Sequence, residues 1–504
     1  MASLKDIAKT GRKAEAHRPW PRAVVTRDGW KLAVKELVDA RATMLGLWGD
    51  KGAVHLALIE EPSAEIGVFT LECPDGKFPS VAALHPPANR LERTIASLYG
   101  LKPVGTPDMR AWLDLGFWGM TKPLGKAKKS RVALAPYVFL PVDGEAMHQI
   151  PVGPVHAGII EPGHFRFTAN GETVVRLEER LGYVHKGIES LLAGASIEQG
   201  ALLAGRTSGD STVAYAFAFA QAIEAALQVK VPQRAIWLCA LMAELERMAN
   251  HLGDIGAICN DASFSLLFAE CGILRERTLR AADACFGHRL MMDRIVPGGI
   301  SEDLRPEGEA SLRDLLHTVR ARFPELVAIY DNTATLQDRT ATTGYLSPTL
   351  ARAFGAGGYV GRASGRAFDA RKAIAYPPYD KLDFEVPVRD DGDVNARVWI
   401  RIREVEQSLR LIDQILDRLP NGAVRTELNQ AGEVREGLAM TEAFRGDLLV
   451  YVRLDAKGTI ERCHLRDASW FQWPLLEAAI EGNIVADFPL CNKSFNCSYS
   501  GHDL

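Results

Sequence analysis

Closely spaced cysteine pairs are absent from this 504-residue chain. Its eight cysteines are scattered, and the two nearest, Cys491 and Cys497, lie six positions apart. Nickel and iron–sulfur clusters are held by thiolates, which proteins commonly supply in closely spaced pairs. The sequence therefore predicts no thiolate-bound metal centre. Most of the cysteines fall in apolar helical patterns, where a buried, unreactive thiol is the expected role.

A strong net charge and long hydrophobic runs are also missing. The formal net charge of -4 gives no electrostatic basis for binding nucleic acid or an anionic membrane surface. The uncharged run over 211–223 is too short to span a bilayer, and the charged segment 1–20 shows no secretory signal. Unpaired cysteines suit a reducing compartment. We therefore expect a cytoplasmic chain without a transmembrane segment, which reaches a membrane only through partners.

The composition, 47% hydrophobic and 24% charged, is that of a globular protein long enough for two or more domains. Residues 21 to about 119 mix β-like runs (54–59 and 66–71) with turns and a helix over 89–100 that ends at glycine. A lysine-rich stretch with glycine and proline follows, and from residue 150 the pattern is mostly helical. The predicted class is α+β: a small α/β domain over 1–119, a linker over 120–149, and a large, mainly helical domain with small β elements over 150–504.

Apolar periodicity predicts helices over 211–229, 233–252, 270–290 and 397–419. The last is the clearest, because apolar residues from Val398 to Leu419 recur at steps of three and four. The segment 344–383, rich in glycine, proline and tyrosine, predicts an ordered loop or short strands. Residues 435–455 predict two strands around a turn.

Five motifs after residue 150 occur in the order found in one family. They are GPVH (153–156) with EPGHFR (161–166), LGYVHKGIE (181–189), ELERMANH (244–251), GRASG (361–365) with DAR (369–371), and EAFRG (442–446). Together they resemble the large subunits of group 4 membrane-bound nickel–iron hydrogenases and the related 49 kDa subunit of complex I. Segment 78–108, with Glu92-Arg93 and Leu98-Tyr99-Gly100, resembles the 30 kDa subunit of complex I, although Thr106 stands where that family usually has histidine.

Two Cys-x-x-Cys pairs hold the metals in those hydrogenases. The matching positions here are Ser208 with Ser211 and Ser498 with Gly501. The resemblance therefore implies a retained scaffold without its ligands: no nickel–iron centre, no cofactor bound by this chain and no hydrogenase activity. The end at Leu504, without the extension that many hydrogenase large subunits lose after nickel insertion, points the same way. Iron–sulfur clusters are expected in partner subunits.

The resemblance also places candidate site residues around a small polar cavity at the former metal site. Arg445 matches an arginine that lies above the metal centre in the hydrogenases. A proton-relay carboxylate of the hydrogenases, or a quinone-binding histidine of complex I, matches one of Glu161, Pro162 and His164, and the sequence does not decide which. The quinone-binding tyrosine of complex I falls at Gly209, which cannot donate that hydrogen bond, so quinone is an alternative ligand only. The full candidate set is Glu161, His164, Arg206, Ser208, Asp210, Ser211, Arg445 and Ser498, with Ser500 beside them.

A further set of motif residues is expected to form buried scaffold ion pairs and contacts with other subunits. These are Tyr183, His185, Glu189, Glu244, Glu246, Arg247 and His251.

The resemblance implies a subunit of the soluble arm of a complex I-like, membrane-bound oxidoreductase complex. Its expected partners are a small iron–sulfur subunit and membrane-arm subunits at the inner face of the cell membrane, and its expected role is to couple redox or proton changes to ion translocation. Three alternatives stay open: a quinone-reducing subunit of the NADH dehydrogenase type, an active hydrogenase with unusual ligands, and a purely structural assembly factor.

Overall fold

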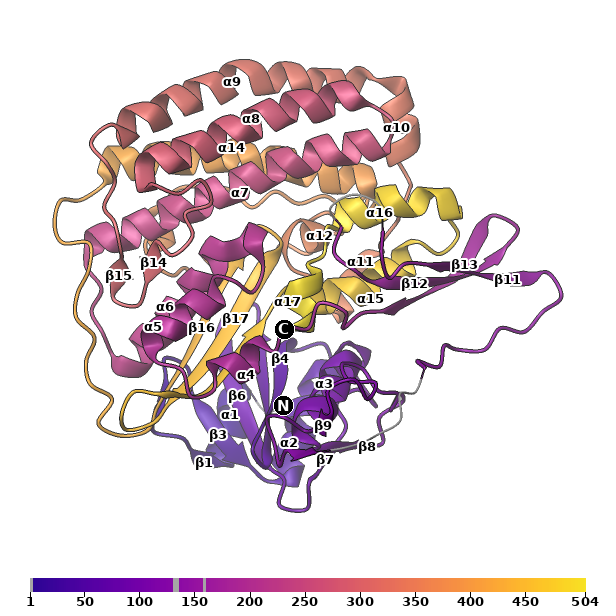
Figure 1. Ribbon diagram of the computed structural model, residues 1–504, viewed down its shortest axis with the longest axis vertical. Coiled ribbons are helices and arrows are strands. Elements are labelled where there is room, and N and C mark those ends of the chain that lie inside the picture. Colours follow the sequence, from indigo (N-terminus) through magenta and orange to yellow (C-terminus); the bar gives the residue numbers. More distant parts are fainter. Residues whose placement is uncertain (1–2, 130–135, 157–159) are drawn as a thin grey trace.

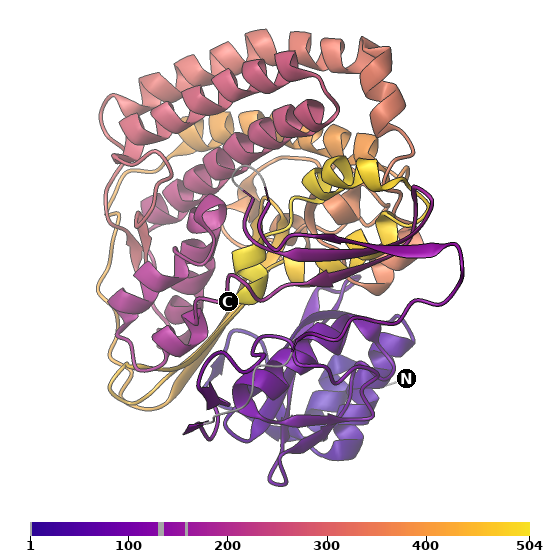
Figure 2. The same cartoon turned by 45° about the vertical axis from the view of Figure 1, so that its right-hand side comes forward.

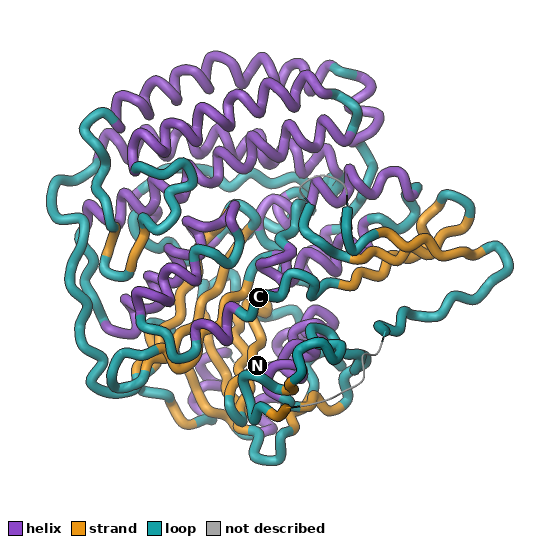
Figure 3. Tube along the Cα trace, in the orientation of Figure 1, coloured by secondary structure: helices purple, strands orange, loops and turns teal. Residues whose placement is uncertain are grey.

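The computed structural model describes residues 3–129, 136–156 and 160–504 (Figure 1). Helices gather at one end of the molecule and most strands at the other (Figure 3). In this described part of the chain, no helix is long and apolar enough to cross a membrane. The predicted α+β class is confirmed.

The N-terminal region is built around a sheet with the strand order β1-β3-β6-β5-β4. Strands β4 to β6 form an antiparallel meander, and β3 runs parallel to β6. Helix α3 ends at Gly100, whose φ of 71° is the left-handed conformation that glycine adopts readily at helix ends. The predicted strands and helix of this region are confirmed. The elements are α1 (Leu4–Lys9), β1 (Arg12–Lys13), β3 (Arg22–Val25), α2 (Arg27–Val38), β4 (Thr43–Asp50), β5 (Ala53–Glu60), β6 (Glu65–Glu72), β7 (Lys77–Pro79), α3 (Asn89–Tyr99) and β8 (Lys102–Val104).

The N-terminal region interlocks with the rest of the chain. Strand β2 (His17–Arg18) pairs in parallel with β16 (Arg435–Ala443), completing a sheet with the order β18-β17-β16-β2. The other members are β17 (Gly446–Leu454) and β18 (Ile460–Arg466). Trp48 of β4 packs in one apolar cluster with Tyr451 of β17. The regions on the two sides of residue 119 therefore share a sheet and an apolar cluster, and the division into domains there stays a prediction.

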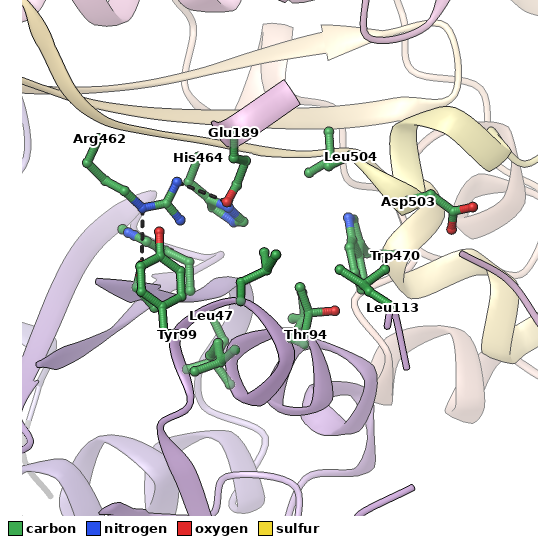
Figure 4. Close-up of a pocket in the computed structure, with 15 residues that line it drawn as sticks. Leu47, Thr94, Tyr99, Leu113, Glu189, Arg462, His464, Trp470, Asp503 and Leu504 are labelled. Atoms are coloured by element: carbon green, nitrogen blue, oxygen red, sulfur yellow. Dashed lines mark hydrogen bonds and ion pairs between the residues drawn. The ribbon is translucent and has the colours of Figure 1, made fainter. Parts of the chain in front are cut away.

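A second part of this junction lies between α3 and β18 (Figure 4). Glu189 accepts a hydrogen bond from His464 at 2.6 Å and pairs with Arg462 at 3.0 Å, and the Arg462 guanidinium lies over the Tyr99 ring. The cavity between these side chains measures only about 20 Å³. The junction is thus a packed contact with room for about one water molecule.

Long helices form the opposite end of the molecule. They are α7 (Gln233–Asp261), α8 (Ser265–Phe286), α9 (Gly308–Asn332) and α14 (Val394–Arg418), which lie side by side in Figures 1 and 2. The apolar stripe of α14 is buried as predicted. Helix α9, which contains Pro324, was not predicted.

Shorter elements connect these layers. Helix α6 (Thr212–Leu227) packs on β16 and β17. Within 344–383, all of which the structure describes, there are short helices and ordered loop but no strand. Of the two predicted possibilities, the ordered loop is found and the short strands are not. The remaining helices are α4 (Ile188–Leu192), α5 (Ile197–Ala204), α10 (Ala334–Thr340), α11 (Pro348–Ala353), α12 (Gly358–Arg362), α13 (Ala370–Ala373), α15 (Ser469–Ala479), α16 (Phe488–Phe495) and α17 (Tyr499–Asp503).

Four small sheets complete the described fold, one of them the parallel pair β7 and β8. Strands β11 (Met147–Val152), β12 (His164–Asn170) and β13 (Thr173–Arg180) form an antiparallel sheet beside the C-terminal helices (Figure 2). Strands β14 (Ile295–Val296) and β15 (Gly299–Ile300) form a hairpin in the helical region. Within the predicted linker, β9 (Met120–Thr121) and β10 (Lys128–Lys129) pair as a short ribbon.

Candidate functional site

The two segments that match the metal-binding ends of the hydrogenases meet in the structure. Ser208, which precedes the short 3-10 turn η2 (Gly209–Ser211), and Ser498, which precedes α17, lie with their hydroxyl oxygens 2.9 Å apart. Ser498 also caps α17, because its hydroxyl accepts a hydrogen bond from the Gly501 amide at 2.9 Å. The two segments are thus joined by a direct serine–serine hydrogen bond.

Arg445 lies at the turn between β16 and β17 and reaches into the same place. Its Nη1 and Nη2 donate to the two carboxylate oxygens of Asp210 at 2.8 and 2.5 Å, and Nη1 also contacts the Ser211 hydroxyl at 3.1 Å. Its Nε donates to the Asn496 carbonyl oxygen at 2.5 Å. Burial disfavours the charged form of Asp210, but the Arg445 charge and the surrounding hydrogen bonds outweigh it and hold the pKa of Asp210 at about 2. Asp210 is therefore ionised and paired at neutral pH.

A cavity of about 370 Å³ opens over this pair. Of the predicted residues, Glu161, Ser208, Asp210, Arg445, Ser498 and Ser500 line it, and Ser211 lies behind Asp210. Glu161 accepts a hydrogen bond from the Ser500 amide at 3.2 Å. Sequence reasoning missed other members of the wall, among them Asp261, Asn492, Lys493 and Asn496. Two of these, Asn492 and Lys493, come from α16, which precedes the second motif by only a few residues.

Two predicted residues lie elsewhere. Arg206 points away from the cavity and pairs with both oxygens of Asp293, at 2.6 and 2.8 Å, on an exposed surface. His164 lies on β12, where its Nδ1 is 3.1 Å from the Gly153 carbonyl oxygen, and it does not line the cavity. The predictions of both residues as cavity members are wrong, and Glu161 is the member of its motif that the structure brings to the site.

The position of the fourth cysteine ligand is filled. A Cβ atom at Gly501 would lie 2.8 Å from both Asp467 Oδ2 and the Tyr215 hydroxyl oxygen, which themselves are joined by a 2.7 Å hydrogen bond. Real Cβ atoms do not approach other atoms so closely, so a side chain at Gly501 requires a rearrangement.

The donor set does not fit a nickel–iron group. Hydroxyls, carboxylates and a guanidinium line the cavity in place of the thiolates that soft metals select. Cys497 lines the cavity, but burial raises the pKa of its thiol well above the usual value and so disfavours the thiolate. Over the ranges that the structure covers, no group of three or more His, Cys, Asp or Glu side chains is arranged to hold a metal ion.

A buried ionic network supports the Arg445 turn from behind. Arg247 donates to the Glu442 and Ala443 carbonyl oxygens at 2.6 and 3.0 Å, at the start of the turn that carries Arg445. Other pairs in the network join Arg362 with Glu404 and Glu442, His251 with Glu404, and Arg371 with Glu244. The prediction of buried scaffold ion pairs is confirmed for Glu244 and Arg247. Burial lowers the pKa of His251, so its 2.7 Å contact with Glu404 is a hydrogen bond of the neutral ring.

Glu189 also forms the predicted buried ion pair, with Arg462, as described above. His185 contacts the Asp503 carbonyl oxygen at 2.7 Å. Glu246 forms hydrogen bonds to backbone amides rather than an ion pair. Tyr183 is 47% exposed, so it is not buried, and its role in contacting another subunit stays a prediction.

Two protein-family models match this chain. The family model described as respiratory-chain NADH dehydrogenase, 49 Kd subunit, matches residues 261–435 and 430–503, and the model for the 30 Kd subunit matches residues 24–131.

Individual relatives extend the match over most of the chain. Formate hydrogenlyase subunit 5 of Escherichia coli (strain K12) is 33% identical over 437 residues, covering 85% of this chain and 77% of that protein. Hydrogenase-4 component G of the same organism is 30% identical over 90% of this chain and 80% of that protein. The C/D subunit of the NADH-quinone oxidoreductase of Phocaeicola vulgatus is 27% identical over 85% of this chain and 88% of that protein.

A solved structure shares the fold. A chain of the membrane-bound sulfane sulfur reductase, described as an archaeal respiratory membrane complex, superposes with a TM-score of 0.68 and 25% identity over 72% of this chain and all of that one. The fold is thus shared with a subunit of a membrane-bound respiratory complex over 72% of this chain.

Proposed function

Since this chain belongs to the family of group 4 hydrogenase large subunits and complex I 49 kDa subunits, with a 30 kDa-type region in the same polypeptide, we propose that it is a metal-free coupling subunit in the peripheral arm of a complex I-like complex. Related chains are subunits of complex I-like and hydrogenase complexes, and the structural relative comes from a membrane-bound one. We also propose that the chain lies beside a small iron–sulfur subunit and membrane-arm subunits at the inner face of the membrane.

The observation that carries this proposal is the replacement of the metal ligands by a closed polar network. The Ser208–Ser498 hydrogen bond and the Arg445–Asp210 pair occupy the floor of the cavity, and Asp467 with Tyr215 fills the place of a side chain at Gly501. Such a network holds charges and protons without holding a metal. A change of charge in a neighbouring subunit acts on it through the Arg445–Asp210 pair, whose carboxylate faces the cavity.

The first test is the nickel content per polypeptide of the purified complex. We expect far less than one nickel per chain, because no thiolate set is present to bind it. Nickel is the informative element, since iron–sulfur clusters in partner subunits contribute iron. Stoichiometric nickel that survives dialysis against a chelator would overturn the metal-free assignment, and the ligands would then be sought around Cys497.

The coupling role needs a separate test. Deleting this chain is expected to abolish ion translocation by the assembled membrane arm. Normal translocation by an assembled complex that lacks this chain would rule out coupling, even if the complex were found to contain no nickel.

One observation favours a second candidate, reduction of a quinone. The cavity carries apolar groups, Ile160, Pro489 and Tyr499, beside its polar floor, and a Cβ at Gly209 would meet no atom within 4 Å. If quinone binds there, Asp210→Asn should lower quinone-dependent turnover at least tenfold, the loss expected from about 1.4 kcal/mol of lost interaction. Asp293→Asn is the matched control, because Asp293 pairs with Arg206 outside the cavity. Under the coupling proposal the purified complex has no quinone turnover for either variant to change.

A further inference from the structure

A second cavity lies on the other side of the η2 turn from the main one. It measures about 180 Å³, and Gly209 and Asp210 line both cavities. Gly209 contributes no side chain, and even an added Cβ would find open space. This second cavity, called the inner cavity below, has room for several water molecules, and its wall carries polar groups that can bind them.

Glu246 lies at the wall of the inner cavity, on α7. Its side chain is buried, and its two carboxyl oxygens accept hydrogen bonds from the Val213 and Ala214 amides at 2.7 and 3.0 Å. Among the residues that the structure describes, no cation forms an ion pair with it. Asn250, one turn further along α7, donates to the carbonyl oxygens of both Asp210 and Glu246, at 2.8 and 2.9 Å, and so ties η2 to the helix.

The charged groups around Glu246 come from several elements. Asp210 faces it from η2, and Arg275 of α8 and Arg289 of the following loop complete the cavity wall. Arg289 is already paired with Glu276 at 2.7 Å, and Arg247 on α7 itself is directed toward Glu244 at 3.3 Å and the Arg445 turn. A buried carboxyl beside another carboxylate and without its own cation holds a proton more firmly than an exposed one.

We propose that Glu246 is a proton-binding carboxyl at the inner end of a hydrated passage that runs from the main cavity, past Gly209, into the inner cavity. On deprotonation the Glu246 O–H proton passes to a cavity water, and a water at the other end of the chain releases one proton toward the main cavity. No electron moves in this step. The inference rests on the proposed coupling function, for which it names the residue that stores the proton.

The electrostatics of the site agree with this role. Burial, aided by the Asp210 charge, raises the pKa of Glu246 to about 8, against the two amide hydrogen bonds and Arg247, which lower it. A carboxyl whose folded-state pKa is raised contributes stability at low pH, and that contribution is lost as the pH rises through about 8. Loss of the proton places the Glu246 carboxylate near that of Asp210, whose partner is Arg445, so proton uptake relieves the repulsion between the two carboxylates.

The test is infrared spectroscopy of the full-length chain during a pH titration, following the carbonyl band of protonated carboxyl groups. We expect a component with a midpoint near pH 8 that disappears in Glu246→Gln, whose neutral amide has the shape of the protonated acid. Glu224→Gln is the matched control: Glu224 is also buried, with a pKa raised to about 7, but it lines a different cavity. It should remove a separate component and leave the one near pH 8 intact.

A variant that keeps Glu246 tests the passage. Gly209→Leu places a side chain between the two cavities without backbone strain, and we expect it to slow hydrogen–deuterium exchange of the Glu246 carboxyl severalfold while its titration midpoint stays near 8. An unchanged band in Glu246→Gln, a midpoint below pH 6, or unchanged exchange in Gly209→Leu would overturn the inference. None of these outcomes depends on the nickel content, so failure here is distinguishable from failure of the metal-free assignment.

Discussion

Replacing Arg362 with leucine is expected to destabilise the fold by about 3–5 kcal/mol, the cost of removing one partner from a buried ion pair. The guanidinium is fully buried and donates to Glu404 at 2.6 and 2.9 Å, to Glu442 at 2.8 Å and to the Phe368 carbonyl oxygen at 2.9 Å. Without it, the three buried carboxyl groups of Asp369, Glu404 and Glu442 share one fewer cation. Urea denaturation followed by circular dichroism measures the loss.

The matched control is Arg403→Leu on α14. Arg403 also forms an ion pair, with Glu406 at 2.9 Å, but its side chain is 55% exposed. Exposed pairs contribute about 0–1 kcal/mol, so this variant should denature close to the native chain. Equal losses in both variants would contradict the view that the network behind Arg445 is a main support of the fold.

The position of the buried network explains its importance for the site. It joins α7, α12, α14 and β16, and Arg247 within it binds the carbonyl groups of Glu442 and Ala443, three and two residues before Arg445. The arginine on the cavity floor is therefore held in place by groups that do not line the cavity. Glu442→Gln tests a milder change at the same place, because it keeps the shape of the carboxyl that Arg362 contacts.

Most of the fold could be predicted because its long helices and its central strands carry regular apolar periods. Helix α14 and strands β5 and β6 are examples, with bounds close to those predicted. Helix α9 has a similar buried stripe, but Pro324 and many charges obscure it. The short helices in 344–383 could not be predicted, because turns of four to six residues carry too little periodic signal.

The site residues were predicted from the positions of the motifs in the sequence. The prediction fails where the position of a residue does not determine the direction of its side chain. Ser208 and Ser498 meet because the family scaffold brings their segments together, 290 residues apart in sequence. Arg206 is two residues from Ser208, yet the chain direction there turns its side chain outward to Asp293. Glu246 resembles its ion-paired neighbours in sequence, and only the packing of α6 on α7 shows that it binds backbone amides instead.

Changing both Ser208 and Ser498 to cysteine is expected to produce a disulfide bond on mild oxidation rather than a metal site. The two hydroxyl oxygens are already 2.9 Å apart, so sulfur atoms in their place need only approach to the bonding distance of about 2.05 Å. The bond would close a very long loop and is expected to raise the free energy of unfolding by about 2–4 kcal/mol. Mobility on a non-reducing gel and urea denaturation with and without reductant measure both effects.

The controls for this cross-link come from the same cavity. Ser211→Cys with Ser498→Cys should stay reduced, because the Ser211 hydroxyl points to Asp210 and Arg445. Ser208→Cys alone tests whether the native Cys497, which lines the cavity, competes for the new thiol.

The double variant extended with cysteines at Ser211 and Gly501 should still bind no stoichiometric nickel. Asp467 and Tyr215 occupy the space of a Gly501 side chain, and Arg445 places a positive charge on the cavity floor. Nickel uptake by the four-cysteine chain would show that the scaffold still accepts the metal and that loss of the thiolates alone accounts for its absence.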